Sequence, residues 1–186
     1  MAQGSLIKVD EFTVSSGAAS VIIGGGTGGS SSNNYQMSST YDVYALHVNG
    51  LATDTDDVNV YARFVSGNGT VLSASSYAYG MYALKTYSAF EEASQTGQSA
   101  FRMNIQQIGT TEDEDYHGIH YIHDAGNTSN YTFMTIETVN VDDSQYLHGN
   151  IGGGGYAVDT GVTGIQFYLS SGNINGGTFS LYGLKK

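Results

Sequence analysis

The stretch 116–126, YHGIHYIHDAG, carries three histidines spaced three residues apart, followed by an aspartate. Imidazole nitrogens and carboxylate oxygens are zinc ligands, so metal binding is the first chemistry to consider here. On a β-strand, His117 and His123 would share one face but lie ~20 Å apart at a rise of ~3.3 Å per residue, while His120 would point to the other face. One ion cannot span that distance. The sequence therefore predicts a strand that ends near Asp124 and carries partly exposed histidines, with no metal site.

Three acidic clusters are the next candidates for cation binding. An EF-hand loop needs oxygen ligands at positions 1, 3 and 5, glycine at position 6 and glutamate at position 12. Counted from Asp54, the pattern fails at positions 5, 6 and 12, which are Val58, Asn59 and Val65. We expect solvated acidic loops, with adventitious calcium binding as the open alternative. The clusters are Asp54–Asn59 (DTDDVN), Glu112–Asp115 (EDED) and the pair Asp142 and Asp143.

Catalytic motifs are not found. The glycine-rich stretch 24–34 (GGGTGGSSSNN) lacks the Lys-Ser/Thr end of a phosphate-binding loop and a helix after it. The chain has no Gly-x-Ser-x-Gly nucleophile elbow and no cysteine, so it has neither a thiol nucleophile nor a disulfide. A carboxylate pair for glycoside cleavage stays open among 17 acidic residues, but nothing singles one out. We expect no catalytic residue, no cofactor and no enzymatic activity.

Charge narrows the range of partners. Six Lys and Arg residues against 17 Asp and Glu give a net charge of −11. The basic residues form no stripe that could neutralise phosphates, so we expect neither a nucleic-acid nor a membrane partner. The start, MAQGSLIKVDEFTV, has no basic region followed by an apolar one, so we expect no signal peptide and synthesis in a cytoplasm. The scattered basic residues are Lys8, Arg63, Lys85, Arg102, Lys185 and Lys186.

Apolar and polar residues alternate with period two, which predicts an all-β fold. Asn-Gly and Gly-Asn steps at 67–69 and 172–173 predict turns, and 131–139 (YTFMTIETV) predicts a further strand. We expect a single domain over 1–186, an antiparallel, jelly-roll-like β-sandwich. A short helix is expected at Ser88–Gln98, and flexible glycine-rich loops at 24–34 and 152–155. The expected inward residues are Tyr44, Leu46 and Val48; Val58, Val60, Ala62 and Phe64; Phe101, Met103 and Ile105; and Ile165, Phe167 and Leu169, with Arg102, Asn104 and Gln106 outward.

Tyrosine is the most abundant aromatic residue, with 15 copies and no tryptophan. Four of them, Tyr77, Tyr79, Tyr82 and Tyr87, fall within twelve residues. About half of the tyrosines are expected in the core. Because tyrosine combines a flat apolar face with a polar tip, the others predict a surface for protein contacts or sugar stacking.

Four segments together resemble a family of small virion proteins of marine and cyanobacterial tailed phages. The specific one is the closing segment Ile165–Leu184, IQFYLSSGNINGGTFSLYGL, which follows the pattern I-x-F-x-x-S-S-G-N-I-x-x-G-T-F-x-L-Y-G. The others are an opening strand pair (LIKVDEFTVSSGAASVII), the strand Tyr41–Val48 (YDVYALHV) and a strand leading into an Ala-Gly-x-Thr turn (YIHDAGNTSNYTF). The resemblance implies a jelly-roll-like sandwich and carries no catalytic residues.

The same resemblance implies a place on the virion's outer surface after assembly in the host cytoplasm. We expect a capsid decoration or knob protein on the outside of the head, in contact with the major capsid protein or other virion proteins. A homo-oligomer, specifically a trimer, is expected. The alternative is a tail-fibre or spike component that recognises host surface glycans; against it, the sequence has no coiled-coil or repeat stem.

Overall fold

The computed structural model describes residues 6–87, 89–142 and 144–184, and this part of the chain contains no α-helix. Two short 3-10 turns lie at Gly26–Gly28 and Glu112–Glu114. The strands are β1 (Leu6–Val14), β2 (Ser20–Ile23), β3 (Val43–Thr53), β4 (Val60–Ser66), β5 (Thr70–Val71), β6 (Tyr77–Lys85), β7 (Glu91–Gln98), β8 (Phe101–Arg102), β9 (Tyr116–His123), β10 (Thr132–Val141), β11 (Leu147–Tyr156), β12 (Val162–Leu169) and β13 (Ile174–Leu184).

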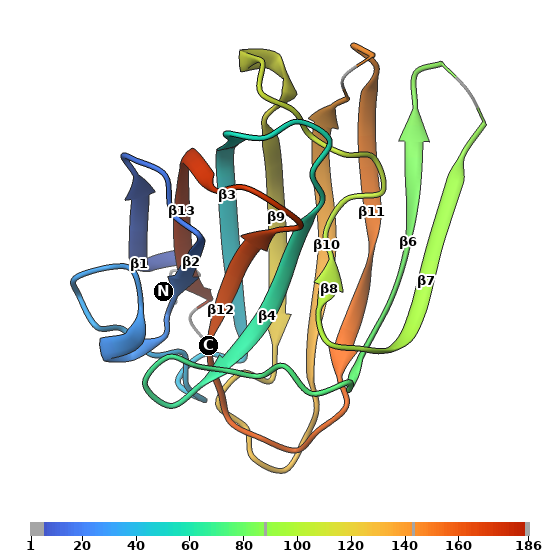
Figure 1. Cartoon of the computed structure of the whole chain (residues 1–186). Coiled ribbons are helices and arrows are strands. Elements are labelled where there is room, and N and C mark those ends of the chain that lie inside the picture. The colour runs from blue at the N-terminus through green and yellow to red at the C-terminus, as the bar shows by residue number, and fades with distance from the viewer. Residues whose placement is uncertain (1–5, 88, 143, 185–186) are drawn as a thin grey trace, which may run out of the picture.

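The strands form two antiparallel sheets that pack face to face, which confirms the predicted β-sandwich. The large sheet has eight strands in the order β1-β13-β3-β9-β10-β11-β6-β7, and the small sheet has the order β2-β12-β4-β5, with β8 beside β4. Figure 1 shows β2, β12, β4 and β8 in front of the large sheet. The first strands pair with the last ones, β1 with β13 and β2 with β12, so the two ends of the chain are neighbours in both sheets. The opening strands β1 and β2 therefore lie in different sheets and are not the pair expected from the sequence.

The residues predicted to point inward belong to the core, which also takes residues from β2, β6, β9 and β10. The inward residues expected on β3, β4 and β12 are buried, and Phe179 and Leu181 of β13 join them. Across the sheets, the rings of Phe167 and Phe179 lie 5.5 Å apart. The turn between β4 and β5 holds Gly67 and Gly69 at positive φ, and Gly172 does the same before β13. The first turn confirms the predicted hairpin, and the second confirms a turn, although it joins strands of different sheets rather than a hairpin.

The strand predicted from Phe101 ends after two residues. Met103 still donates its amide to Val60 of β4, and the chain beyond it covers the inner face of β10 and β11. Met103 and Ile105 are buried there. Asn104, expected to point outward, is fully buried. Its Oδ1 accepts a hydrogen bond from the backbone N–H of Val60 at 2.9 Å, and its Nδ2 donates to the carbonyl of Gln106 at 2.7 Å. A buried segment without a strand partner needs such side-chain bonds for its backbone groups.

The helix predicted at Ser88–Gln98 is wrong. The described part of this segment contains β7, which pairs with β6 at the edge of the large sheet (Ser88 lies outside the described residues). Most of β7 is exposed, so it lacks the buried alternation by which strands are recognised in a sequence. Its two glutamates, Glu91 and Glu92, place charge on the open edge, which discourages pairing with another chain.

The glycine run 152–155 is not a loop but the middle of β11, paired with β10 on one side and β6 on the other. The neighbouring backbones leave no room for side chains on the inner face. A Cβ at Gly152 would lie 2.6 Å from Cα of Met81, and one at Gly154 would lie 2.9 Å from the Phe101 ring. Close backbone approach, rather than turn formation, is the reason for these glycines.

The other glycine-rich stretch, 24–34, is a loop, but it is packed against the β4–β5 turn rather than free. Gly24, Gly25 and Gly26 are buried, and a Cβ at Gly28 would lie 2.6 Å from Cα of Gly69. The prediction that this stretch connects strands is therefore correct, but the prediction of a free surface loop is wrong, because the stretch is packed against another turn.

We predict that Gly152→Ala lowers the free energy of unfolding by about 1–3 kcal/mol, because the methyl group has to displace the β6 backbone. Urea denaturation followed by tyrosine fluorescence measures this. Gly149→Ala is the matched control on the same strand, because its Cβ would meet nothing nearer than 3.9 Å. Equal midpoints for the two variants would contradict the close approach.

Candidate functional site

The outer face of the large sheet, which the small sheet does not cover, carries the main candidate site. Residues opposite each other in antiparallel strands share a face. The register places Ile119, Glu137, Ile151 and Tyr82 in one row across β9, β10, β11 and β6. All four are exposed. This row is part of a broad surface built from the alternate residues of the four strands.

Large apolar side chains gather on this surface. Ile151 and Tyr82 are the most exposed of them, at 54% and 55%. Exposed apolar groups in such number on one face are typical of a contact surface. We call the set the apolar patch; it consists of Tyr82, Leu84, Ile119, Tyr121, Phe133, Val139, Leu147 and Ile151.

Beside these side chains lies a hollow of about 710 Å³ whose floor is glycine. Gly153 and Gly155 of β11 and Gly80 of β6 face outward there, next to Ser94 of the edge strand. Phe133 forms the opposite wall. We call it the glycine hollow. With no side chains on the floor, an approaching group reaches the peptide backbone itself.

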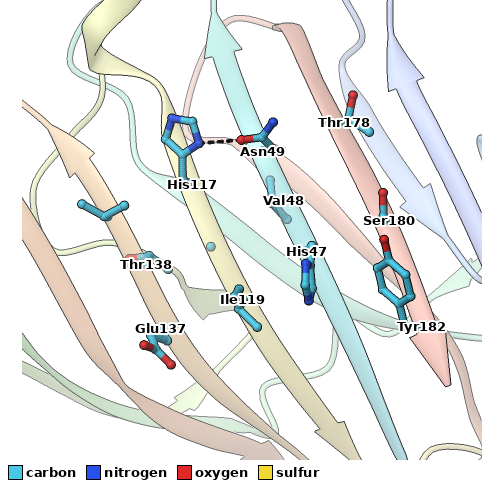
Figure 2. Close-up of a pocket in the computed structure, with 12 residues that line it drawn as sticks. His47, Val48, Asn49, His117, Ile119, Glu137, Thr138, Thr178, Ser180 and Tyr182 are labelled. Carbon is cyan, nitrogen blue, oxygen red and sulfur yellow. Dashed lines mark hydrogen bonds between the residues drawn. The ribbon is translucent and has the colours of Figure 1, made fainter. Parts of the chain in front are cut away.

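A second hollow of about 660 Å³ lies toward β3 and β13, and Figure 2 shows the residues that line it. We call it the polar hollow. The rings of His47 and Tyr182 stand side by side, with centroids 5.1 Å apart. His117 is held at Nδ1, which lies 3.0 Å from Asn49 Oδ1 and 3.2 Å from the Gly50 amide nitrogen that donates to it. A ligand would therefore meet this ring at Nε2.

Glu137 is among the residues that line the polar hollow, and Glu11 of β1 lies next to the hollow, beside the lining residue Ser180. Ser180 donates a hydrogen bond to Glu11 Oε2 at 2.6 Å, and Lys8 Nζ lies 3.1 Å from the same carboxylate. These hydrogen bonds, that from Ser180 first, lower the pKa of Glu11. The hollow thus offers ring faces, amide and imidazole groups and a charged rim, which suits a polar, uncharged ligand better than an anion.

The structure separates the three histidines as the strand prediction requires. His117 and His123 lie on the outer face and His120 on the inner one. His120, expected to be partly exposed, is instead fully buried, and its Nε2 lies 3.0 Å from the Tyr116 hydroxyl. Among the described residues, no group of three or more His, Asp or Glu side chains is gathered as metal ligands would be.

The acidic clusters are more structural than expected. Glu114 is buried and closes a capping box with Thr111. Asp142 is also buried, and its Oδ2 lies 2.8 Å from Nε2 of the buried His148. Burial by itself would raise the pKa of Asp142, but hydrogen bonds from the Tyr146 amide and from His148 outweigh it and lower the pKa. The solvated-loop expectation is therefore wrong for these two residues, and Asp143 lies outside the described part.

The first cluster is also tied into the fold, at Asp56, which accepts hydrogen bonds from Thr110, and at Asp54. Asp54 accepts hydrogen bonds from the backbone amide and the side chain of Asn173, at 2.7 and 2.9 Å, and these bonds lower its pKa. They join the end of β3 to the turn before β13. Asp54 therefore fixes a turn and remains at the surface.

The tyrosines divide between core and surface, as expected. Tyr44, Tyr77 and Tyr116 are fully buried, whereas Tyr82 and Tyr121 belong to the apolar patch. Sequence reasoning expected exposed tyrosines, which the structure has, but it missed the aliphatic residues of the patch and the polar hollow. Neither could be recognised before the order of the strands was known.

No protein-family model, no curated protein and no solved structure matches the chain. None of the helical turns among the described residues is long and apolar enough to cross a membrane.

We predict that His120 makes the fold sensitive to acid. Burial lowers its pKa from 6.5 to about 4, so the unfolded chain takes up a proton before the folded chain does. The resulting loss of stability begins as the pH falls through 6.5 and is complete near pH 4. When the pH is lowered from about 7.5 to 5, the free energy of unfolding of the wild-type protein should fall by about 2 kcal/mol more than that of His120→Gln.

Urea denaturation at the two pH values measures this difference. His123→Gln is the control, since His123 is half-buried on the opposite face of the same strand and should lose as much stability as wild type. If His120→Gln also matches wild type at both pH values, the assignment to His120 is wrong.

Proposed function

We propose that the chain is a structural protein of a phage virion, bound to the outside of the head as a decoration or knob protein. The observation that carries the proposal is the apolar patch, an exposed contact surface in a chain of net charge −11. The resemblance of the closing segment to phage virion proteins supports the same role. The proposed partners are the major capsid protein or other virion proteins, and the role needs no enzyme activity, cofactor, nucleic acid or membrane.

The composition of the patch suits docking to protein. Protein interfaces are enriched in aromatic residues and depleted of charge at their centre. The patch has Tyr82, Tyr121 and Phe133 as anchors. The acids in the same rows are Glu137 and, on the edge strand, Glu92. The acidic loops lie outside the patch and keep the remaining surface well solvated.

We predict that the double variant Tyr82→Ser, Ile151→Ser weakens binding to expanded empty capsids by about tenfold or more, because two central anchors are lost. Co-sedimentation of purified protein with capsids of the phage that encodes it measures the affinity. Val158→Ser, which removes an exposed apolar side chain outside the patch, is the control and should bind as wild type does. Wild-type protein that binds no virion particle would refute the proposal.

A second candidate is a tail-fibre or spike component that recognises host glycans. The observation that favours it is the polar hollow, where the Tyr182 and His47 rings stand next to hydrogen-bonding groups. Sugar rings bind proteins through this combination of a flat apolar face and polar groups. Immunogold labelling of intact phage separates the candidates, with gold over the head for decoration and over the tail for the fibre.

For this candidate we predict saturable binding to a host polysaccharide on a glycan array. His117→Ala and Tyr182→Ala should each weaken that binding by about tenfold, since each removes a wall of the polar hollow. Tyr168→Ala is the control, because Tyr168 stacks on Tyr61 on the small sheet, away from the hollow. An array without any binding would remove the glycan candidate and leave the decoration proposal standing.

A further inference from the structure

We propose that the apolar patch and the glycine hollow pair with the same surface of a second copy, around a two-fold axis that crosses the middle of β11. The inference rests on the proposed assembly role: this face pairs two copies, and the pair meets the capsid through its other surfaces. Loss of the pair is then what weakens capsid binding by the variant Tyr82→Ser, Ile151→Ser. The unit that joins the virion is then a face-to-face dimer rather than the trimer expected from the sequence.

Charge is the first argument for a second copy. Of the twelve central outward positions on β10, β11 and β6, only Glu137 is charged, whereas the whole chain has 17 acidic residues. The end pair Val141 and Leu147 is uncharged too, and Glu92 of β7 is the acid beside Tyr82. Two copies of net charge −11 repel each other, and this surface opposes few charges. The positions are Phe133, Thr135, Glu137, Val139, Gly149, Ile151, Gly153, Gly155, Ala78, Gly80, Tyr82 and Leu84.

The second argument is the division of this surface into large and small residues. Ile151 pairs with Tyr82 across β11 and β6, and the next outward row is Gly153 with Gly80. A two-fold axis perpendicular to the strands, placed between these rows, lays Ile151 and Tyr82 of one copy over the two glycines of the other. A surface that fits itself in this way closes with two copies.

The same axis suits the flanking strands. Ile119 of one copy lies over Tyr121 of the other, because these residues continue the two rows onto β9. Glu137 lies over Thr135 of the second copy, whose hydroxyl can donate a hydrogen bond to the carboxylate. The two Glu137 carboxylates therefore do not oppose each other.

Gly80 gives a third, independent argument. Glycine within a strand costs about 0.5–1 kcal/mol relative to alanine. Yet a Cβ at Gly80 would meet only Cβ of Ser94, at 3.9 Å, and its φ is not in the left-handed region. No contact within the chain requires glycine there. A tyrosine ring from a second copy, seated on the backbone at this position, does require it.

The area is large enough for a stable pair. With the edge strand β7, which borders the glycine hollow, the surface spans five strands, β9, β10, β11, β6 and β7. At ~4.8 Å between strands and ~8 residues along them, they cover about 650 Å² per copy, or about 1,300 Å² for the two. Specific interfaces bury about 1,200–2,000 Å² in total, so the pair falls at the lower end. A dissociation constant in the micromolar range is expected for such a contact.

Sedimentation velocity over about 1–200 μM tests the dimer. Wild-type protein should shift from 19.7 kDa to twice that mass as its concentration rises. Gly80→Val should fold as stably as wild type, because its side chain enters open space, but it should dimerise at least about tenfold more weakly because it blocks Tyr82 of the second copy. Gly149→Val, on the same face, is the matched control, since it lies opposite Gly155 of the second copy and should dimerise normally.

A wild-type protein that stays monomeric, or that forms a trimer, overturns the inference. So does a Gly80→Val protein that dimerises like wild type. Capsid binding is measured separately, so the two proposals fail separately. Monomers that still bind capsids refute the dimer alone, whereas dimers that bind no virion particle support the pairing and refute the virion role.

Discussion

An eight-stranded sheet packs against a sheet of only five strands, and the rest of the structure depends on this mismatch. Over β13, β3 and β9 the small sheet supplies regular cover, with Phe167 against Phe179. Over β10 and β11 it ends, and the segment after β8 takes its place (Figure 1). An irregular segment brings unpaired backbone groups into the core. The large sheet meets them with amide side chains: Asn150 Oδ1 accepts from the Ile105 amide at 3.1 Å.

Whether a strand could be predicted from the sequence depends on whether another strand or an irregular segment covers it. Where a strand is covered on one face by another strand, burial alternates, and the sequence predicted β3, β4 and β12 correctly. Where the covering segment is irregular or absent, burial does not alternate along the chain, and the pattern of apolar and polar residues does not identify the structure. Asn104 was expected to be outward because it is polar, although its amide is what permits burial. The edge strand β7 has almost no buried residues, so its glutamates and alanine resembled a helix.

The glycines of β11 and the candidate site show a second limit of sequence reasoning. Four consecutive glycines favour a loop when only local conformational freedom is considered. The reason for Gly152 and Gly154 is the nearness of β6, which is about seventy residues away in sequence and visible only in the sheet. The polar hollow likewise joins His47, His117 and Tyr182 from three strands. Their residue types could be noted in the sequence, but their proximity follows only from the order of the strands.

The residues on the outer face of the middle strands of the large sheet are relevant to function, because they differ from what a solvent-exposed face carries. An antiparallel sheet with one face in water carries polar residues on that face. The small sheet follows this rule, with Tyr61, Arg63 and Gln166 outward on β4 and β12. The middle of the large sheet does not, since Ile151 and Tyr82 face outward over strands whose inner face is already covered. Apolar residues on both faces are typical of a sheet that is covered twice. The chain supplies one of those covers, and the proposed pairing of two copies would supply the second.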